Sequence, residues 1–92
     1  MTIVYTGTER KHLKSIKSNG LPVGSYVGTQ PYIAEYYAKR THKNGIVVSL
    51  NIPNVERYSE ITDTYKYKNG KSLKLIKKPK TQILIGTMRL SI

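Results

Sequence analysis

Apolar residues recur at every second position in the middle of the chain, which is the pattern of a half-buried β-strand. The stretch 46–52 has Ile46, Val48, Leu50 and Ile52 at these positions, and Pro53 ends it. Because successive side chains of a strand point to opposite faces, the stretch predicts a strand with one apolar face. Shorter apolar runs predict strands at 3–5, 25–27, 83–85 and 88–92, with Gly86 as a bend or bulge, and leave 55–61 as a loop or a short strand.

Two other segments carry apolar residues at helical spacing. The first helix is predicted over 9–19, with Thr8 as its N-cap and Gly20 as the left-handed residue that follows it. The second begins near Pro31 and is capped by Thr29, and one face of it collects Ile33, Ala34, Tyr37 and Ala38.

The order of these elements is β, α, β, α and then mostly β. This order predicts an α+β fold with a small, mostly antiparallel sheet and two N-terminal helices. A chain of 92 residues is expected to form a single compact domain, 1–92.

A basic segment between Tyr65 and Lys80 contains seven lysines and no acidic residue. Within it, alternating tyrosine and lysine at 65–68 is followed by Asn69-Gly70, which is typical of a two-residue type I′ turn. The segment therefore predicts a hairpin over 65–76. With this turn, Tyr67 faces Ser72 and Lys66 faces Leu73, and one face carries Tyr65, Tyr67, Ser72 and Lys74.

The charge balance favours an anionic partner. The chain has 16 basic and 5 acidic residues and a formal net charge of +11, so nucleic acid, a dinucleotide or an acidic protein surface would suit it. Lysines can neutralise phosphates while tyrosine rings stack on bases. The candidate nucleic-acid contacts are Tyr65, Lys66, Tyr67, Lys68, Lys71 and Lys74, and the alternative is a solvated, solubilising face.

Several classes of site and location are disfavoured by what the sequence lacks. Without cysteine there is no disulfide, thiolate metal site or thiol nucleophile. His12 and His42 have no neighbouring pair of carboxylates, so no metal site is expected, and His12 is interpreted as a solvated side chain. The sequence shows no signal-peptide pattern and no apolar run of about 18 residues. We therefore expect no membrane span and a cytoplasmic location, in the host cytoplasm if the protein is viral, and the oligomeric state stays open.

The first half also contains a succession of short motifs: VYTGT, LKSIKSNGL, GSYVGTQPYIAEYYA and GIVVSLNIP. This succession resembles the ADP-ribosyltransferase fold, in the branch of diphtheria toxin and poly(ADP-ribose) polymerase that is related to the RNA 2′-phosphotransferases. In that branch a strand ends in His-Gly-Thr or His-Gly-Ser, and a helix ending in Gly-Leu follows. A Gly-x-Tyr strand then leads into a helix with a second tyrosine, and a glutamate stands near the start of a late strand. The resemblance covers about residues 3–52 well and the end of the chain only loosely.

The resemblance implies that NAD is the substrate and assigns roles to six residues. Gly7 and Thr8 match the Gly-Thr pair whose glycine backbone holds the nicotinamide amide. Tyr26 and Tyr37, with Tyr36 as the alternative to Tyr37, match the two rings that clamp the nicotinamide. Thr6 stands at the position of the family's ribose-binding histidine, and Gln82 stands at the position of its catalytic glutamate.

The two departures from the family pattern leave the function open. Without the glutamate, stabilisation of the positively charged transition state is weakened. One hypothesis is an ADP-ribosyltransferase-like protein that binds NAD and transfers ADP-ribose to a protein or nucleic acid. The other is a non-enzymatic protein that binds nucleic acid or a host factor through the hairpin 65–76. Structural alternatives also stay open, because Tyr37 can be a core residue, Tyr26 can fill the sheet and Gly7 can serve only a turn.

Overall fold

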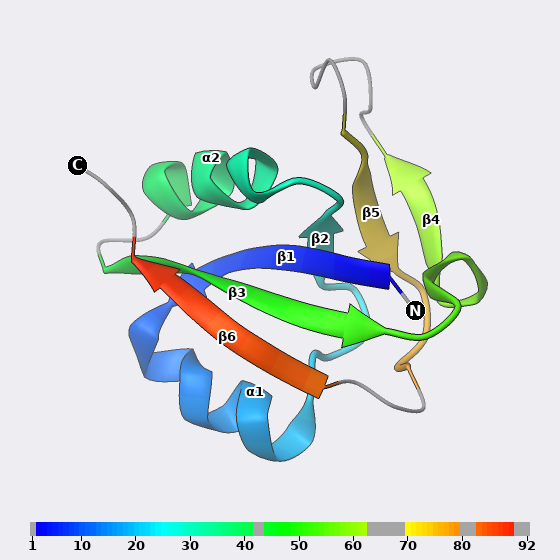
Figure 1. Cartoon of the computed structure of the whole chain (residues 1–92), viewed down its shortest axis with the longest axis horizontal. Helices are drawn as coiled ribbons and strands as arrows, with labels where there is room; N and C mark the ends of the chain where they lie inside the picture. The colour runs from blue at the N-terminus through cyan, green and yellow to red at the C-terminus, as the bar shows by residue number, and fades with distance from the viewer. Residues whose placement is uncertain (1, 42–43, 63–69, 80–82, 90–92) are drawn as a thin grey trace.

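The computed structural model describes residues 2–41, 44–62, 70–79 and 83–89 (Figure 1). Its elements are β1 (Thr2–Glu9), the 3-10 turn η1 (Arg10–His12), α1 (Leu13–Asn19), β2 (Tyr26–Gly28), α2 (Pro31–Thr41), β3 (Gly45–Ile52), the 3-10 turn η2 (Val55–Arg57), β4 (Ser59–Thr62), β5 (Ser72–Leu75) and β6 (Ile83–Arg89). The radius of gyration is 12.0 Å, close to the value of about 12 Å for a folded domain of this length.

The strands form one six-stranded sheet in the order β4-β5-β2-β1-β3-β6, and every neighbouring pair is antiparallel. The α+β class and the antiparallel sheet are therefore confirmed. The helices do not form a block at the N-terminus, because each follows a strand: α1 comes after β1 and α2 after β2. Among the described residues, neither helix is long and apolar enough to cross a membrane.

The sheet narrows to a single residue pair at its centre. β1 pairs with β3 along all eight of its residues, but with β2 only through Tyr5 and Gly28. Figure 1 shows β2 crossing β1 at a steep angle rather than running beside it. The two strands diverge on either side of this pair, so the sheet opens there. The candidate site lies at this opening.

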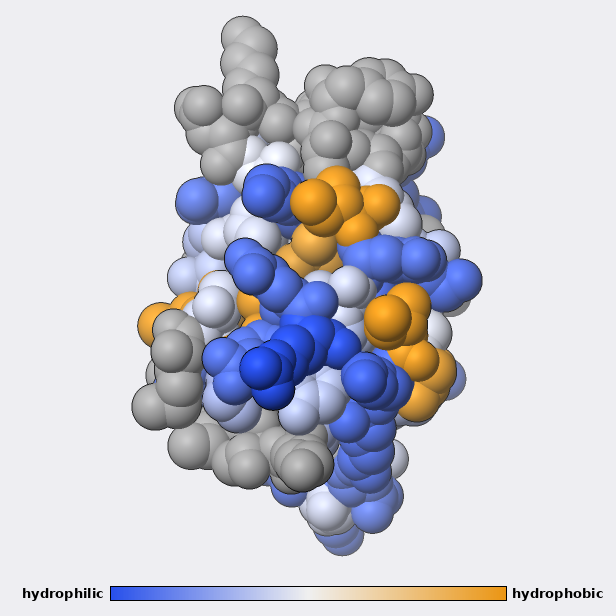
Figure 2. All heavy atoms as spheres, turned by 90° about the vertical axis from the view of Figure 1, so that its right-hand side faces the viewer, coloured by the Kyte–Doolittle hydropathy of each residue, from blue (hydrophilic) through white to orange (hydrophobic). Residues whose placement is uncertain are grey.

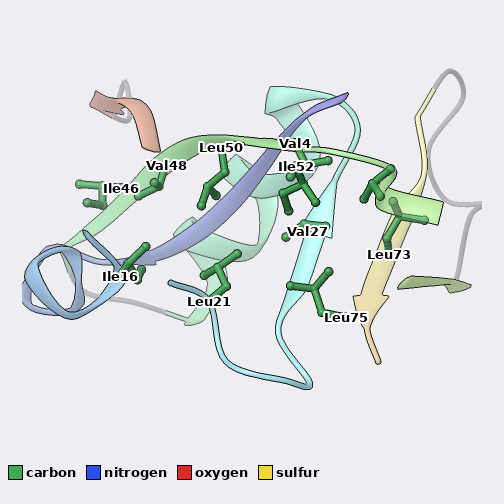
Figure 3. Packing of buried hydrophobic residues seen from close by; sticks show 11 residues of the cluster. Val4, Ile16, Leu21, Val27, Ile46, Val48, Leu50, Ile52, Leu73 and Leu75 are labelled. Carbon is green, nitrogen blue, oxygen red and sulfur yellow. The ribbon is translucent and has the colours of Figure 1, made fainter. Parts of the chain in front are cut away.

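One face of the sheet carries the main hydrophobic core. The alternating apolar residues of β3, which were predicted to form one face of a strand, are all buried on this side of the sheet. Val4 of β1 and Ile16 of α1 pack with them (Figure 3). Val27 of β2 and Leu73 and Leu75 of β5 continue the same cluster beyond the opening. The core therefore holds the two halves of the sheet together beneath the opening.

Helix α2 covers the opposite face at very close range. A Cβ atom at Gly7 of β1 would lie 2.3 Å from the Ala34 carbonyl oxygen, and one at Gly45 of β3 would lie 2.7 Å from that of Ala38. A Cβ at Gly28 of β2 would likewise lie 2.7 Å from the Ile33 Cβ atom. Glycines thus let the helix backbone approach β1 and β3 and let the Ile33 side chain approach β2. The predicted apolar helix face is confirmed, since its isoleucine and both alanines are buried.

The start of the first helix was predicted wrongly. Thr8 pairs with Ile46 and Glu9 with Gly45, so both residues belong to β1, and Thr8 is no helix cap. Pairing with the long strand β3 outweighs the local capping signal, and α1 begins only at Leu13. The predicted end is confirmed, because Gly20 has a positive φ of 75° and its N–H donates to the Ile16 carbonyl over 2.8 Å.

The predicted hairpin register is also wrong. Ser72 pairs with Thr62, Leu73 with Ile61 and Lys74 with Glu60, so β5 takes β4 as its partner instead of the segment 65–68. The predicted turn residue Asn69 and the segment 65–68 lie outside the described residues. At the end of the chain, the bulge is confirmed, because Ser49 faces Gly86 while Leu50 faces Leu84, which leaves one extra residue in β6.

The packing of α2 predicts a large cost for Gly7→Ala. The added methyl group would overlap the Ala34 carbonyl, so the helix must move away from the sheet, and overpacking of this kind costs about 1–3 kcal/mol. Gly86→Ala is the matched control, because its Cβ would meet no atom within 4 Å. Urea unfolding should show a clearly lower free energy of unfolding for the first variant and a change within about 0.5 kcal/mol for the second. Equal stabilities of the two variants would contradict this packing.

Candidate functional site

A cleft of about 720 Å³ lies where β1 and β2 diverge. Residues of β1, β2, α1 and α2 line it, together with Thr62 of β4 and Ser72 of β5. Its apolar lining comes from the core and from α2, namely Ile16, Leu21, Val27, Ile33 and Ala34. Small-molecule sites in proteins commonly have volumes of about 300–1,000 Å³ with a largely apolar lining and a few polar groups, so the cleft is suited to a ligand of nucleotide size.

The predicted NAD-binding residues come together in this cleft. Thr6, Gly7, Thr8, Tyr26 and Tyr37 all line it, although they come from β1, β2 and α2. The predicted catalytic residue, Gln82, lies outside the described residues. The strand after it, β6, is separated from β1 by β3 and adds no residue to the described lining of the cleft.

The two candidate clamp tyrosines differ in their surroundings. Tyr26 is 52% exposed, so its ring offers a surface for stacking. Tyr37 is half-buried, and its ring meets that of Tyr36 edge to face at a centroid distance of 5.5 Å. Tyr36 in turn lies under the Arg40 guanidinium, 5.1 Å from the ring centroid, and its hydroxyl accepts a hydrogen bond from Arg40. Tyr37, and not Tyr36, is therefore the helix tyrosine of the cleft, and its neighbour supports its ring.

Thr6 ties the two diverging strands together. Its side chain is only 6% exposed, and its hydroxyl donates to the Tyr26 carbonyl over 3.1 Å. This bond joins β1 to β2 at a place where they share no backbone ladder beyond Tyr5 and Gly28. The Thr6 side chain thus positions the backbone of Tyr26.

Gly7 has a structural reason to be glycine as well. Any side chain there would collide with α2, whether or not a ligand is present. Gly7 also lines the cleft, so the residue that admits the helix borders the candidate ligand site.

The polar side chains in the described lining of the cleft are hydroxyls and one imidazole. Among the described residues, its polar side chains are His12 and the hydroxyls of Tyr5, Thr6, Thr8, Ser15, Ser25, Tyr26, Tyr37, Thr62 and Ser72. Three of these hydroxyls donate to backbone carbonyls: Thr6 to Tyr26, Ser25 to Pro22 over 2.7 Å and Thr62 to Ser72 over 3.1 Å. Their oxygens keep lone pairs that can accept hydrogen bonds from an amide or hydroxyl of a ligand.

This part of the cleft contains no carboxylate and no group of residues suited to a metal ion. A transferase reaction would therefore find no negative side chain among the described lining residues to stabilise a developing positive charge. The arrangement is suited to binding a ligand by stacking and neutral hydrogen bonds.

Sequence reasoning missed several lining residues. His12 was interpreted as a solvated side chain, and although it is exposed it also lines the cleft from the end of η1. The order of the strands brings Thr62 and Ser72 to the cleft. Ser72 pairs with both Thr62 and Gly28, and Gly28 pairs with Tyr5. No local pattern in the sequence signals these long-range pairings.

The predicted basic site is described only in part. Tyr65, Lys66, Tyr67 and Lys68 lie outside the described residues, whereas Lys71 is exposed and Lys74 is half-buried. The Lys71 N–H donates to the Thr29 hydroxyl over 2.8 Å, which joins the start of β5 to the loop after β2. Lys74 faces Tyr26 across β5 and β2. The two candidate sites thus adjoin each other.

Comparison with models of protein families, with curated proteins and with solved structures finds no match to this chain.

The bond from Thr6 to Tyr26 predicts the effect of two substitutions. Thr6→Val removes the hydroxyl but keeps the shape of the side chain, and it leaves the part-buried Tyr26 carbonyl without this donor. We expect a loss of about 1 kcal/mol in the free energy of unfolding. Urea unfolding measures this loss, and Thr6→Ser keeps the hydroxyl but loses a buried methyl group, which costs about 0.8 kcal/mol by itself. A valine variant as stable as the unsubstituted protein would show that the bond does not hold the strands.

Proposed function

We propose that this chain is an ADP-ribosyltransferase-like protein that binds NAD in the cleft between β1 and β2. The observation that carries the proposal is the convergence of Thr6, Gly7, Thr8, Tyr26 and Tyr37 on one cleft. These residues belong to motifs on three separate elements, β1, β2 and α2. Their common location supports the resemblance to the ADP-ribosyltransferase fold.

The chemistry of the cleft fits the nicotinamide end of NAD. A flat ring stacks favourably on tyrosine, and the exposed ring of Tyr26 is available for this. The carboxamide of the ligand can bond to the β1 backbone beside Gly7, and its N–H groups can donate to hydroxyl oxygens of the lining. The apolar residues between α1 and α2 would exclude water from the ring.

Binding is the first part of the proposal, and transfer of ADP-ribose to a protein or nucleic acid is the second. In this step the bond between the nicotinamide nitrogen and the ribose C1′ of bound NAD would break, and nicotinamide would leave with the bonding electrons. A nucleophile of the acceptor would bond to C1′ and release its proton to solvent, while the protein orients the reacting groups. The described lining has no carboxylate, and Gln82 would offer an amide in place of the family's glutamate. We therefore expect transfer to be slow compared with a family member that has the glutamate, because an amide carries no charge to stabilise the transition state.

NAD binding predicts a thermal shift that depends on two tyrosines. At a concentration 100 times its Kd, a ligand raises the free energy of unfolding by about 2.7 kcal/mol, so NAD should raise the Tm of the protein. Tyr26→Ala and Tyr37→Ala should each remove most of this rise. Tyr32→Ala is the matched control, since Tyr32 lies on α2, is 43% exposed and does not line the cleft.

Two results would contradict NAD binding in the cleft. One is the absence of any shift with NAD at millimolar concentrations. The other is a shift that the Tyr32 variant loses as completely as the two cleft variants.

A second candidate function is electrostatic binding of nucleic acid through the basic segment. Lys71, Lys77 and Lys78 are all exposed, and Figure 2 shows strongly hydrophilic side chains across the face that carries β4 and β5. Two apolar residues of this region, Ile61 and Ile76, are also exposed. Positive charge beside apolar surface is suited to a phosphate backbone with unstacked bases.

Nucleic-acid binding predicts a steep dependence on salt. For a single-stranded oligonucleotide, the logarithm of the binding constant should fall linearly with that of the salt concentration, by about 0.7 for each phosphate contact. Lys71→Gln should reduce the slope by about this amount, whereas Lys39→Gln, an exposed lysine of α2, should leave it unchanged. A slope near zero, or one that both variants reduce equally, would contradict contact through the basic segment.

A further inference from the structure

Lys74 occupies a position at the rim of the cleft that its place in the sequence did not indicate. On β5 it lies directly opposite Tyr26 of β2. Directly opposed residues of antiparallel strands point to the same face of the sheet, with Cβ atoms about 5 Å apart. Lys74 therefore projects on the same side as Tyr26, although it is not itself among the lining residues.

A second neighbour fixes the relation of Lys74 to the cleft. Ser72 precedes it by two residues on β5, so the two side chains share a face. Ser72 is buried and lines the cleft. Lys74 thus has one lining residue across the strands and another along its own strand, which places the start of its side chain at the edge of the cleft.

No ion pair holds the Lys74 ammonium among the residues that the structure describes. Its neighbour on the other side is Glu60 of β4, which is exposed, and the described part of the chain records no ion pair between them. The described lining of the cleft itself has no acidic residue that would compete for the ammonium. The flexible four-carbon stem of a lysine lets its charge reach across neighbouring side chains.

We infer that Lys74 binds a phosphate of the ligand whose ring stacks on Tyr26. The ligand class of the cleft is then a nucleotide, a flat base joined through a ribose to a phosphate, and not a free base or an uncharged nucleoside. This inference rests on the proposed ring binding at Tyr26 and Tyr37 and goes beyond it by naming the phosphate and the residue that holds it.

Two sources can present this chemistry. One is a free dinucleotide such as NAD, in which the nicotinamide ribose carries a diphosphate. The other is the 5′-phosphorylated end of a nucleic-acid strand, whose terminal base would enter the cleft. Both place a phosphate next to a stacked ring, so Lys74 serves either of them.

Three ligands with no, one and two phosphates test the inference by isothermal titration calorimetry: nicotinamide riboside, nicotinamide mononucleotide and NAD. The first two differ only in the phosphate. We expect the mononucleotide to bind the unsubstituted protein about tenfold more tightly than the riboside, which is a typical strength for one charge-assisted contact. In Lys74→Gln this ratio should fall close to one, while the affinity for the riboside should stay unchanged.

The matched control is Lys78→Gln, which removes the same charge from an exposed lysine beyond β5 and should keep the tenfold ratio. If Lys74→Gln keeps the tenfold ratio while Tyr26→Ala still loses binding of the riboside, the Lys74 inference is overturned and the proposed ring binding stands. Binding of none of the nicotinamide ligands and of no oligonucleotide would overturn the proposed function and the inference together. A ratio reduced equally by Lys78→Gln would show a general effect of charge and also overturn it.

The source of the phosphate is decided by a second pair of ligands, a tetranucleotide with and without a 5′-phosphate. If the nucleic-acid end is the ligand, the phosphorylated form binds more tightly than the mononucleotide, and Lys74→Gln removes the preference for the phosphate. If a dinucleotide is the ligand, NAD binds most tightly and the 5′-phosphate has no effect. Both results support the phosphate contact and differ only in what carries it.

Discussion

The close contact of α2 with the sheet is the constraint on which the rest of the structure depends. Three adjacent strands present Gly7, Gly28 and Gly45 to the helix. The helix places alanines against the first and the last of these glycines and Ile33 against Gly28. One helix thereby bridges β1, β2 and β3, although β1 and β2 share only a single residue pair. The two halves of the sheet stay together although they share only this pair. Helix α2 packs across the opening on one face of the sheet, and the hydrophobic core joins both halves on the other face.

The candidate cleft is a direct consequence of this arrangement. Because α2 is fixed against β1, Tyr37 on the helix lines the same cleft as Thr6 and Gly7, while the bond from Thr6 to the Tyr26 carbonyl ties β2 to β1. The residues proposed to bind a ligand therefore also hold the fold together. A substitution in the cleft must be judged by stability and by binding, and the proposed functional experiments pair cleft variants with matched controls for this reason.

The sequence allowed prediction of those features that depend on neighbouring residues. The alternation at 46–52, the apolar face around Ile33 and the bulge at Gly86 were all predictable because each is set by local periodicity or by glycine. The Asn69-Gly70 motif led to a wrong hairpin register, because it predicted that the segment 65–68 pairs with 71–74, whereas β5 pairs with β4 and β2. Ser72, and Lys74 opposite Tyr26, could not be linked to the cleft beforehand, because only the strand order brings β5 beside β2.

Nuclear Overhauser effects between NAD and tyrosine ring protons would test the central claim most directly. If the nicotinamide lies between Tyr26 and Tyr37, its ring protons should show transferred effects to both tyrosine rings, identified by their loss in Tyr26→Phe and Tyr37→Phe samples with deuterated phenylalanine. Effects to one ring only, to Tyr32 or Tyr58 instead, or to no tyrosine would contradict the account.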